Sequence, residues 1–427
     1  MMAIKTLLVC QWFPPEPILV PLTIATELHD RGHTLEVLTG IPNYPTGRVA
    51  SGYRTWQRSN EIQDGIPVRR TPLYPSHDSS AIKRMANYLS WAASSTVYGF
   101  RAIRRADVAL VYSSPATAAT APAVWRAIAH TPFVLLIQDL WPDSVAASGM
   151  ARRGAITAAI EWALHRFVAW TYRRAAHIVV ISPSMIDLLT SRGVPRDKIT
   201  LVYNWASEES TPATPTTRST ARSELGIKDD AFVISYAGNH GVAQGLSNVI
   251  AAAALVNDED SDVVFVLAGD GVETAKLIEA AHASGGTNIH FPGRLDATHM
   301  ASLRLATDVQ LVSLIDDKLF AVTMPSKVQS ILASAQPLIV VAPGDAADVA
   351  HRSGAGWAVA PGDPQSLAAA ARTARATSAD ELAQMAKAGK AYYEETMSKD
   401  IGGHRLDLVL RDAAGRATGP LTNGESR

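Results

Sequence analysis

The 427-residue sequence has little cysteine and no excess of charge of either sign. Its one cysteine, Cys10, excludes an internal disulfide, which is typical of a protein kept in a reducing compartment. The 39 basic residues are balanced by 40 acidic ones, whereas a nucleic-acid-binding protein normally carries a clear positive surplus. The composition therefore disfavours nucleic acid as a partner and favours a cytoplasmic location.

Long hydrophobic runs are also missing. The apolar stretch near the N-terminus ends at Cys10, which is too short for the core of a signal peptide. The longest uncharged stretch, residues 108–125, contains Pro115 and Pro122, and these prolines favour a strand, a turn and a helix over a membrane span. We therefore expect no transmembrane segment.

Apolar runs of strand length alternate with helical patterns along the chain. This alternation is typical of parallel sheets that are covered by helices on both faces. Strands are expected at Thr6–Cys10, Thr34–Leu38, Asp107–Tyr112, Phe133–Ile137, His177–Ile181 and Ile199–Val202, and in the second half at Phe232–Tyr236, Val263–Leu267, Ile289–Phe291, Val309–Ser313 and Leu338–Val341. The sequence predicts an α/β protein of two doubly wound, Rossmann-like domains with a ligand cleft between the carboxyl ends of their sheets.

A polar segment separates the two halves. Residues 207–222 contain two Thr-Pro turns and almost no apolar side chain, which predicts a linker. We accordingly expect an N-terminal domain over residues 1–206 and a C-terminal domain over residues 223–395. Residues 396–427 are expected to form a last helix, packed back on the N-terminal domain, and a frayed tail.

Glycine-rich loops follow several expected strands of the second half. The stretch "SYAGNHGVAQGL", residues 235–246, places Gly238, Asn239 and Gly241 between a strand and a helix, where backbone N–H groups can face a phosphate. A glycine turn that only lets the helix pack closely on the strand has the same pattern. The loop "FPGRLD", residues 291–296, adds Gly293 and the cation of Arg294 at the same edge of the sheet.

The loop "TMPSKVQS", residues 323–330, brings a second cation to this edge. Pro325 suits a first helical turn, and Ser326 and Lys327 lie beside it. A lysine at a helix start opposes the helix dipole, unless a bound phosphate neutralises it. Together the loops predict a pocket for a diphosphate and a ribose; the alternative for Lys327 is a solvated lysine.

The first half has one informative acidic loop, "IQDLWPDS", residues 137–144. Asp139 follows an expected strand and would face the cleft. An Asx turn or a helix cap is the alternative role, for which Asp143 competes. The first strand is followed by "QWFPPEPILVP", which lacks the glycines of a dinucleotide-binding fingerprint. No His/Cys cluster has zinc spacing, so no metal site is predicted.

Two expected helices combine basic and aromatic residues. They are "AIKRMANYLSWAASSTVYGFRAIRR", residues 81–105, and "EWALHRFVAWTYRR", residues 161–174. Helices of this composition can lie on an anionic bilayer. An ordinary core-facing helix with solvated arginines has the same pattern, and the sequence leaves both interpretations open.

The motifs together resemble the retaining sugar-nucleotide glycosyltransferases of the two-domain GT-B type, family 4, and among them the bacterial colanic-acid or fucosamine-type transferases of surface-polysaccharide assembly. The resemblance runs from residue 40 to residue 340. It is carried by "GIPNYPTGRVASGY", "IQDLWPDSVAASG", "VISPSMIDLLTSRGVPRDKITLVYNW", "YAGNHGVAQGL", "LAGDG", "FPGR" and "TMPSKVQSILASAQPLIV".

The resemblance implies that the C-terminal domain binds a nucleoside-diphosphate sugar, with a UDP-sugar favoured, and that no metal cofactor is required. It implies that the N-terminal domain binds a glycan, glycolipid or lipid-linked acceptor, and that the enzyme acts in the cytoplasm or peripherally at the inner membrane leaflet. By the same resemblance, the catalytic residues are Asp139, beside the reacting sugar, and Arg294 and Lys327, at the leaving diphosphate. Donor contacts are implied for the same two cations and for Gly238, Asn239, Gly241, Gln244, Gly293, Pro325 and Ser326.

Three features depart from the family pattern. Many members use two glutamates, the second on the ribose, where this chain has Val322 and Ser330, so that Gln329 or Ser330 would make the ribose contact. Gln244 stands where many relatives carry a basic residue, and the first loop lacks glycine. These departures leave open a catalytically degenerate transferase that serves as a binding subunit. The shared architecture leaves open a sugar-nucleotide epimerase as a second alternative.

Overall fold

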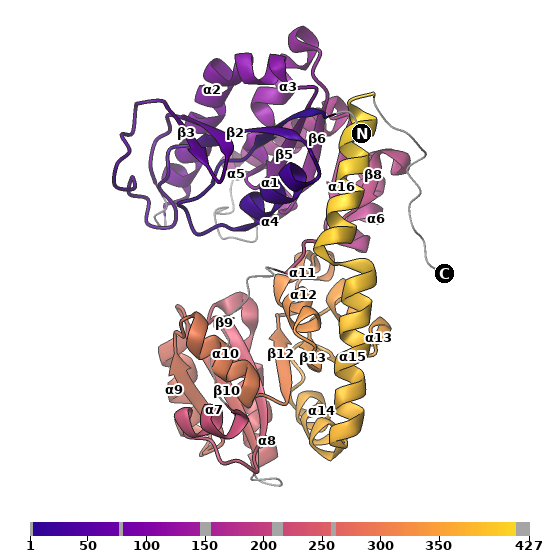
Figure 1. Cartoon of the computed structure of the whole chain (residues 1–427). Coiled ribbons are helices and arrows are strands. Elements are labelled where there is room, and N and C mark those ends of the chain that lie inside the picture. Colours follow the sequence, from indigo (N-terminus) through magenta and orange to yellow (C-terminus); the bar gives the residue numbers. More distant parts are fainter. Residues whose placement is uncertain (1–2, 77–79, 146–154, 207–216, 258–261, 416–427) are drawn as a thin grey trace. The chain divides into compact units, whose positions relative to one another are not determined.

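The computed structural model describes residues 3–76, 80–145, 155–206, 217–257 and 262–415. The chain divides into two compact units (Figure 1). Unit 1 comprises Met1–Asn204 and Lys399–Arg427, and unit 2 comprises Trp205–Ser398. Most of the expected linker lies outside the described residues, but its last residues belong to a helix of unit 2, α7 (Arg218–Glu224), whose N-terminus is capped by the Thr217 side chain.

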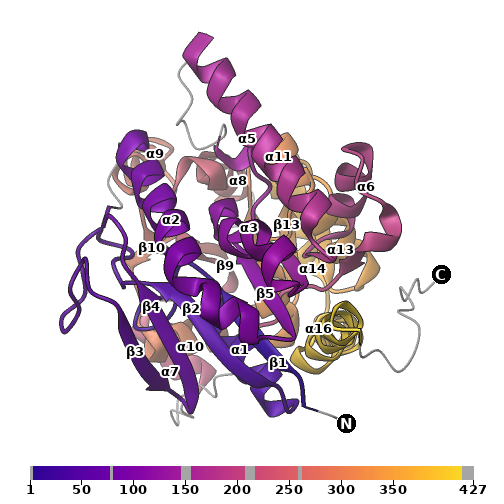
Figure 2. The same cartoon turned by 90° about the horizontal axis from the view of Figure 1, so that it is seen from above.

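Unit 1 is built on an eight-stranded sheet in the order β3-β4-β2-β1-β5-β6-β7-β8. Figure 2 labels β3, β4, β2, β1 and β5 of this sheet. Its strands are β1 (Lys5–Val9), β2 (Thr34–Gly40), β3 (Ser59–Gln63), β4 (Ile66–Thr71), β5 (Val108–Ser113), β6 (Phe133–Ile137), β7 (His177–Val180) and β8 (Ile199–Leu201). Its helices are α1 (Val20–Asp30), α2 (Ala81–Arg105), α3 (Thr120–Ala129), α4 (Asp143–Val145), α5 (Ala155–Arg174), α6 (Pro183–Ser191) and α16 (Lys399–Ala413), with 3₁₀ turns η1 (Ala116–Ala119) and η3 (Arg196–Lys198). All neighbouring strands run parallel except the edge pair β3–β4.

Unit 2 has a six-stranded parallel sheet in the order β11-β10-β9-β12-β13-β14. Its strands are β9 (Phe232–Asn239), β10 (Val263–Asp270), β11 (Ile289–Gly293), β12 (Val309–Ser313), β13 (Leu338–Val341) and β14 (Gly356–Val359). Besides α7, its helical elements are η4 (Val242–Gln244), α8 (Leu246–Asn257), α9 (Thr274–Ala283), α10 (Ala297–Ala306), α11 (Lys318–Ala321), α12 (Ser326–Ala333), α13 (Asp345–Arg352), α14 (Pro364–Ala376) and α15 (Ala379–Thr396).

Both sheets change direction of strand order once, between β1 and β5 in unit 1 and between β9 and β12 in unit 2. The prediction of two doubly wound α/β domains is therefore confirmed. In such sheets, ligands bind beyond the carboxyl ends of the strands where the order reverses. This rule directs attention to the loops after these four strands.

The expected strands are all present, with bounds that differ by at most three residues, but three further strands were not predicted. Two of them, β3 and β4, form a hairpin closed by Asp64 and Gly65, which both have positive φ angles of 50° and 77°. An Asp-Gly pair between two short runs is a strong hairpin signal that the sequence does contain. The third, β14, is a four-residue edge strand with little apolar length.

The last helix, α16, packs on unit 1 and contacts α1. A buried polar chain fastens it: His33 lies with Nδ1 2.8 Å from the Thr6 hydroxyl and Nε2 2.6 Å from the Asp407 carboxylate. Arg411 also donates to Asp407. Burial by itself would raise the pKa of Asp407, but these two hydrogen bonds hold that pKa below its usual value. The carboxylate therefore links the end of the chain to its first two strands.

An ion pair anchors α7 to the unit 2 sheet. The Arg222 side chain is only 3% exposed and donates to Asp308 Oδ2 at 2.8 Å and to the Ala306 carbonyl at 3.2 Å. Asp308 Oδ2 also accepts from the Val233 backbone N–H at 2.8 Å. One carboxylate thus satisfies both a buried cation and a strand amide.

Replacing Asp308 by Ala should destabilise unit 2 by about 3 kcal/mol, because it leaves the Arg222 guanidinium buried without a counter-ion. Hydrogen exchange of the β9 and β12 amides measures this loss locally. Asp262→Ala is the matched control, since Asp262 forms a half-exposed pair with Arg375 that should contribute less than about 1 kcal/mol. Equal exchange in the two variants would contradict the prediction.

Candidate functional site

The ends of β9 and β10 lie unusually close together. The two strands pair in register up to Gly238 opposite Gly269 and Asn239 opposite Asp270. A side chain on Gly269, where φ is +137°, would collide with the backbone of Gly238. Glycine at this position is therefore required by both the close approach and the backbone conformation.

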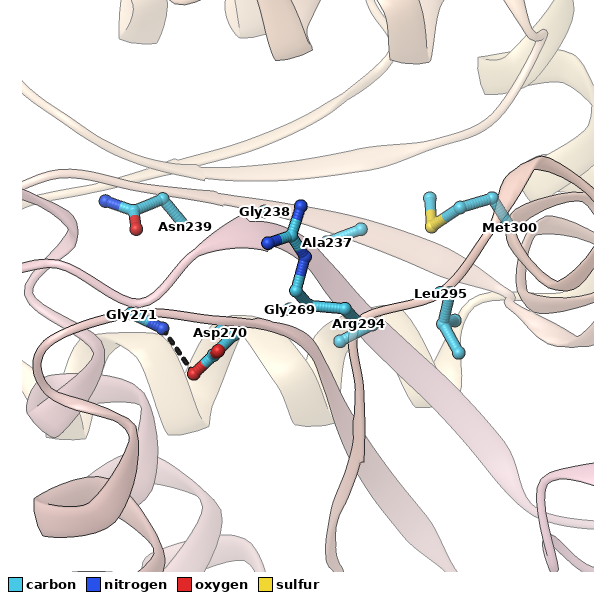
Figure 3. Close-up of a pocket in the computed structure, with 10 residues that line it drawn as sticks. Ala237, Gly238, Asn239, Gly269, Asp270, Gly271, Arg294, Leu295 and Met300 are labelled. Atoms are coloured by element: carbon cyan, nitrogen blue, oxygen red, sulfur yellow. Dashed lines mark hydrogen bonds between the residues drawn. The ribbon is translucent and has the colours of Figure 1, made fainter. Parts of the chain in front are cut away.

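A cavity of about 570 Å³ opens beyond these strand ends (Figure 3). It is lined by Ala237, Gly238, Asn239, Ala268, Gly269, Asp270, Gly271, Arg294, Leu295 and Met300. Asp270 accepts hydrogen bonds from the Gly271 N–H at 2.7 Å and the Thr274 hydroxyl at 3.1 Å, and these lower the pKa of its carboxyl. The Asp270 carboxylate thus remains charged and shapes the loop, while Arg294 contributes a cation to the cavity.

Lys327 places a second cation beside the first strand end. Its ammonium lies 3.6 Å from the ring centroid of Tyr236 and in contact with Gly238, where a Cβ atom would overlap it. No carboxylate pairs with Lys327 in the part of the chain that the structure describes. Burial lowers the pKa of Lys327 to about 7. The amine is therefore partly desolvated, and a bound anion would stabilise its charged form.

The glycine-containing loop of residues 235–246, which the sequence predicts to face a phosphate, divides into two parts. Gly238 and Asn239 line the cavity, whereas Gly241 is buried and its N–H donates to the Gln244 side chain at 3.1 Å. The Gln244 backbone carbonyl in turn accepts from the Ser313 hydroxyl at 2.7 Å. Gln244 thus braces the loop against β12, and the Gly241 N–H is occupied within the protein.

The start of helix α12 lies one residue later than the sequence predicts. Pro325 is the N-cap residue, one position before the helix, and Ser326 and Lys327 form the first turn. Gln329 is buried, with its amide facing the carbonyls of Pro325 and Ser326, so it does not line the cavities described here. Ser330 is exposed and lines a second cavity of about 590 Å³ together with Lys327. Of the two residues predicted for a ribose contact, the structure leaves Ser330 accessible.

These two cavities share Ala237 and Met300 in their walls. Gly293, which has a φ of +76°, turns the chain at the end of β11 so that Arg294 reaches the first cavity. The structure therefore brings Gly238, Asn239, Arg294 and Lys327 to one edge of the sheet, as the loop pattern predicts.

His240 follows this loop and was not singled out from the sequence. It is fully buried beside the rings of Tyr236 and Phe291, and its Nδ1 lies 3.1 Å from the Thr274 hydroxyl. Burial lowers the pKa of His240, so a neutral imidazole is favoured. The imidazole thus packs under the loop between Tyr236 and Phe291. The sequence signal for this role is that His240 directly follows the glycine-containing end of β9.

Asp139 of unit 1 lies two residues beyond the end of β6, as predicted. Its Oδ2 accepts a hydrogen bond of 2.5 Å from Ser114, which follows the neighbouring strand β5. Although the residue keeps an exposed surface, the protein atoms around the carboxyl raise its pKa, and the Ser114 hydrogen bond opposes this rise. Asp143 instead begins α4 and pairs with Arg192 at 2.8 Å, so Asp139 is left without a capping role for that helix.

A buried glutamate organises the first loop of unit 1, which contains no glycine. Glu16 is 2% exposed and accepts backbone N–H bonds from Phe13 at 3.1 Å and from Asn43 and Tyr44 at 2.8 Å each. Burial raises the pKa of Glu16 to about 7, although the three donors act in the opposite direction. The carboxylate fastens the loop after β1 to the loop after β2.

Among the described residues, no group of three or more His, Cys, Asp or Glu side chains is arranged to hold a metal ion. Over the same residues, no helix combines the length and the apolar character needed to cross a bilayer.

Two family models match the chain. The model described as "Glycosyl transferase 4-like domain" matches residues 20–205, and the model described as "Glycosyl transferases group 1" matches residues 217–392. The chain therefore belongs to the glycosyltransferases that combine these two domains. The change from one model to the other lies close to the division between the two units, and the resemblance inferred from the motifs is confirmed.

Curated relatives agree with this assignment. The chain is 28% identical over 315 residues to a putative colanic acid biosynthesis glycosyl transferase, WcaI, of Escherichia coli K12, covering 73% of this chain and 76% of the relative. It is 27% identical over 269 residues to a probable glycosyltransferase, WbjE, of Pseudomonas aeruginosa, covering 62% of this chain and 65% of that protein.

Solved structures share the fold. HepE of Anabaena, determined with UDP and glucose, superimposes with a TM-score of 0.67 at 17% identity, over 95% of this chain and 99% of that chain. WaaG, a glycosyltransferase involved in lipopolysaccharide biosynthesis, has a TM-score of 0.62 at 15% identity, over 98% and 100% of the two chains. At such identities the likeness concerns the fold alone.

Proposed function

We propose that this glycosyltransferase transfers a sugar from a nucleoside-diphosphate sugar, with a UDP-sugar favoured, to a hydroxyl group of a glycan, glycolipid or lipid-linked acceptor, with retention of the anomeric configuration. The observation that carries the proposal is the pair of cations at this sheet edge: Arg294 lines the cavity beyond the ends of β9 and β10, and Lys327 lines the adjoining cavity. HepE binds UDP in the same fold, and WcaI belongs to colanic acid biosynthesis, which supports a UDP donor and a role in surface polysaccharide.

In the proposed reaction, the bond between the anomeric carbon and the diphosphate oxygen breaks while the acceptor oxygen bonds to that carbon from the same face. Negative charge grows on the departing diphosphate. On this proposal, Arg294 and Lys327 bring positive charge to the two adjoining cavities and stabilise the departing diphosphate electrostatically in the transition state. On this proposal the two cations suffice and no divalent metal is needed.

Asp139 is proposed to orient the acceptor or to stabilise positive charge on the sugar. Its hydrogen bond to Ser114 fixes the carboxylate at the end of the unit 1 sheet. We assign it no covalent role. The acceptor hydroxyl proton leaves with the diphosphate, so that the transfer is balanced without a further reactant.

Lys327→Met should weaken UDP binding about ten- to a hundredfold at pH 7, because a hydrogen bond to a charged group contributes about 1.5–3 kcal/mol. A diphosphate raises the pKa of Lys327 in the complex above its free value of about 7. Wild-type affinity should therefore be highest near pH 7 and fall between pH 7 and 9, and this dependence should vanish in the variant. Calorimetry with UDP in the presence of a chelator measures both effects.

Lys276→Met is the matched control, since Lys276 is exposed on α9 and pairs only weakly with Glu273. It should leave UDP binding and its pH dependence unchanged. The melting temperature of ligand-free Lys327→Met should be raised, because the change removes a desolvated cation that has no counter-ion. Wild-type affinity in Lys327→Met would refute the phosphate assignment, and binding only after magnesium addition would refute the metal-free donor site.

Asp139→Asn should retain the fold and the UDP affinity, while kcat should fall by at least about a hundredfold, since the lost charge acts mainly in the transition state. Ser114→Ala should raise the pKa of Asp139 further and shift the acid limb of the rate profile to higher pH. Donor hydrolysis or transfer by the purified chain provides kcat. Asp143→Asn is the control, and a similar kcat in the two aspartate variants would make Asp139 a structural residue.

Helix α2 is proposed to contact an anionic membrane surface. Ile82, Leu89 and Val97 are 82%, 55% and 67% exposed, and their spacing of seven and eight residues places them on one face of the helix. Arg101 and Arg104 are exposed near that face. An apolar strip bordered by cations suits the headgroup region of a bilayer.

Changing Leu89 and Val97 together to Glu should lower co-sedimentation with phosphatidylglycerol–phosphatidylcholine vesicles at low salt at least about fivefold, because two charges replace apolar groups that enter the headgroup region. Val272→Glu is the control, since this residue is 86% exposed in unit 2. Wild-type binding that is absent at low salt would show that α2 is an ordinary surface helix.

A further inference from the structure

Four aromatic rings form a continuous cluster in unit 1. The centroid of Trp12 lies 5.4 Å from that of Tyr44 and 6.2 Å from that of Tyr88, and Tyr88 lies 5.9 Å from Trp141. The rings are tilted against one another by 47° to 76°, as aromatic pairs prefer. They come from four separate segments: the loop after β1, the loop after β2, the helix α2 and the loop after β6. The sheet topology therefore gathers the rings at its carboxyl edge.

Hydrogen-bonded amides hold three of these segments together below the rings. Gln11, Asn43 and Asn87 each stand one residue before a ring of the cluster, and all three are buried. Gln11 Nε2 donates to Asn87 Oδ1 at 2.6 Å, and Asn87 Nδ2 donates to Asn43 Oδ1 at 3.2 Å. This ladder of amides fixes the spacing of the rings before any ligand arrives.

The buried carboxylate of Glu16 adds a second fixation. It accepts the backbone N–H groups of Asn43 and Tyr44, both at 2.8 Å. The loop that carries Tyr44 is thus held at its backbone and at the Asn43 side chain. Two sets of hydrogen bonds therefore hold this loop, which indicates that the position of the Tyr44 ring is important.

The cluster is not a closed apolar core. Trp141 is 5% exposed, whereas Trp12, Tyr44 and Tyr88 each retain a partly exposed surface. Three rings of a rigid cluster therefore face solvent in part. Small-molecule sites are typically lined by apolar and aromatic side chains with a few placed polar groups, and this cluster has that composition.

The cluster borders Asp139. The Trp141 backbone N–H donates to the Asp139 carbonyl at 3.0 Å. Burial raises the pKa of Tyr88, and the charge of Asp139 adds to that rise, so the phenol and the carboxyl lie within electrostatic reach. A group stacked on these rings would have its hydroxyls close to the Asp139 carboxylate.

We propose that Trp12, Tyr44, Tyr88 and Trp141 bind a pyranose ring of the acceptor, so that the group receiving the new sugar is itself a saccharide. One face of a pyranose carries C–H groups, which pack favourably on the negative face of an aromatic ring. Its hydroxyls remain free to meet Asp139. The inference rests on the proposed function and specifies the acceptor class for it.

Saturation-transfer NMR on the full-length chain with UDP present tests the proposal, with methyl pyranosides of glucose, galactose, mannose, fucose and N-acetylglucosamine as probes. We expect at least one pyranoside to receive saturation on its C–H face. Trp12→Ala and Tyr44→Leu should each weaken its binding about tenfold, since each removes one stacked ring. The second variant keeps an apolar side chain, so it covers the case in which the first does not fold.

Trp56→Ala is the matched control, because Trp56 is 74% exposed in unit 1 and lies outside the cluster. It should bind the same pyranoside as the wild type. Binding of no pyranoside, or equal binding in all variants, would overturn the proposal. Farnesyl phosphate serves as a lipid probe, and the proposal would also be overturned if the cluster variants lost binding of this lipid but kept binding of the pyranoside. Calorimetry with UDP separates this outcome from failure of the donor site, because UDP affinity should be unchanged in each variant.

Discussion

The close approach of β9 and β10 at Gly238 and Gly269 is the constraint on which the donor site depends. Because neither glycine carries a side chain, the two strands approach closely at this point and remain paired up to their last residues, Asn239 and Asp270. To this edge of the sheet the neighbouring loops bring two cations, Arg294 after β11 and Lys327 in the first turn of α12. A methyl group on Gly238 would occupy the position of the Lys327 ammonium, so the glycine and the cation form one structural feature.

Two cations of unit 2, the buried Arg222 and the partly buried Lys327, have different partners. Arg222 is given a carboxylate, Asp308, and two backbone carbonyls, which is the expected arrangement for a structural cation. Lys327 receives an aromatic face and no carboxylate among the described residues. A desolvated ammonium without a counter-ion lowers stability in the ligand-free protein and gains an interaction only when an anion binds. Such a cost at one residue is typical of a functional site.

The sequence is informative where one physical rule dominates. Buried parallel strands are continuous apolar runs, so they could be predicted closely, and the loops at their carboxyl ends followed from topology. The hairpin β3–β4 was missed because its strands, SNEIQ and IPVRRT, are interrupted by polar residues and do not form continuous apolar runs. The partner of Asp139 was missed for another reason: Ser114 is 25 residues away, and only the pairing of β5 with β6 brings the two side chains together. Likewise, only the structure shows that Gln244 braces its own loop.

Glu16 shows how a departure from the family pattern acquires a physical meaning. A glycine-rich loop presents backbone N–H groups to an anion, whereas this loop supplies the anion from within the chain. The Glu16 carboxylate occupies the N–H groups of Phe13, Asn43 and Tyr44, which are therefore not available to a phosphate. The same contacts hold the aromatic loop after β2 in place. The first loop of unit 1 therefore lacks glycine and uses a buried carboxylate to hold the neighbouring loop, so that these three N–H groups are satisfied within the protein.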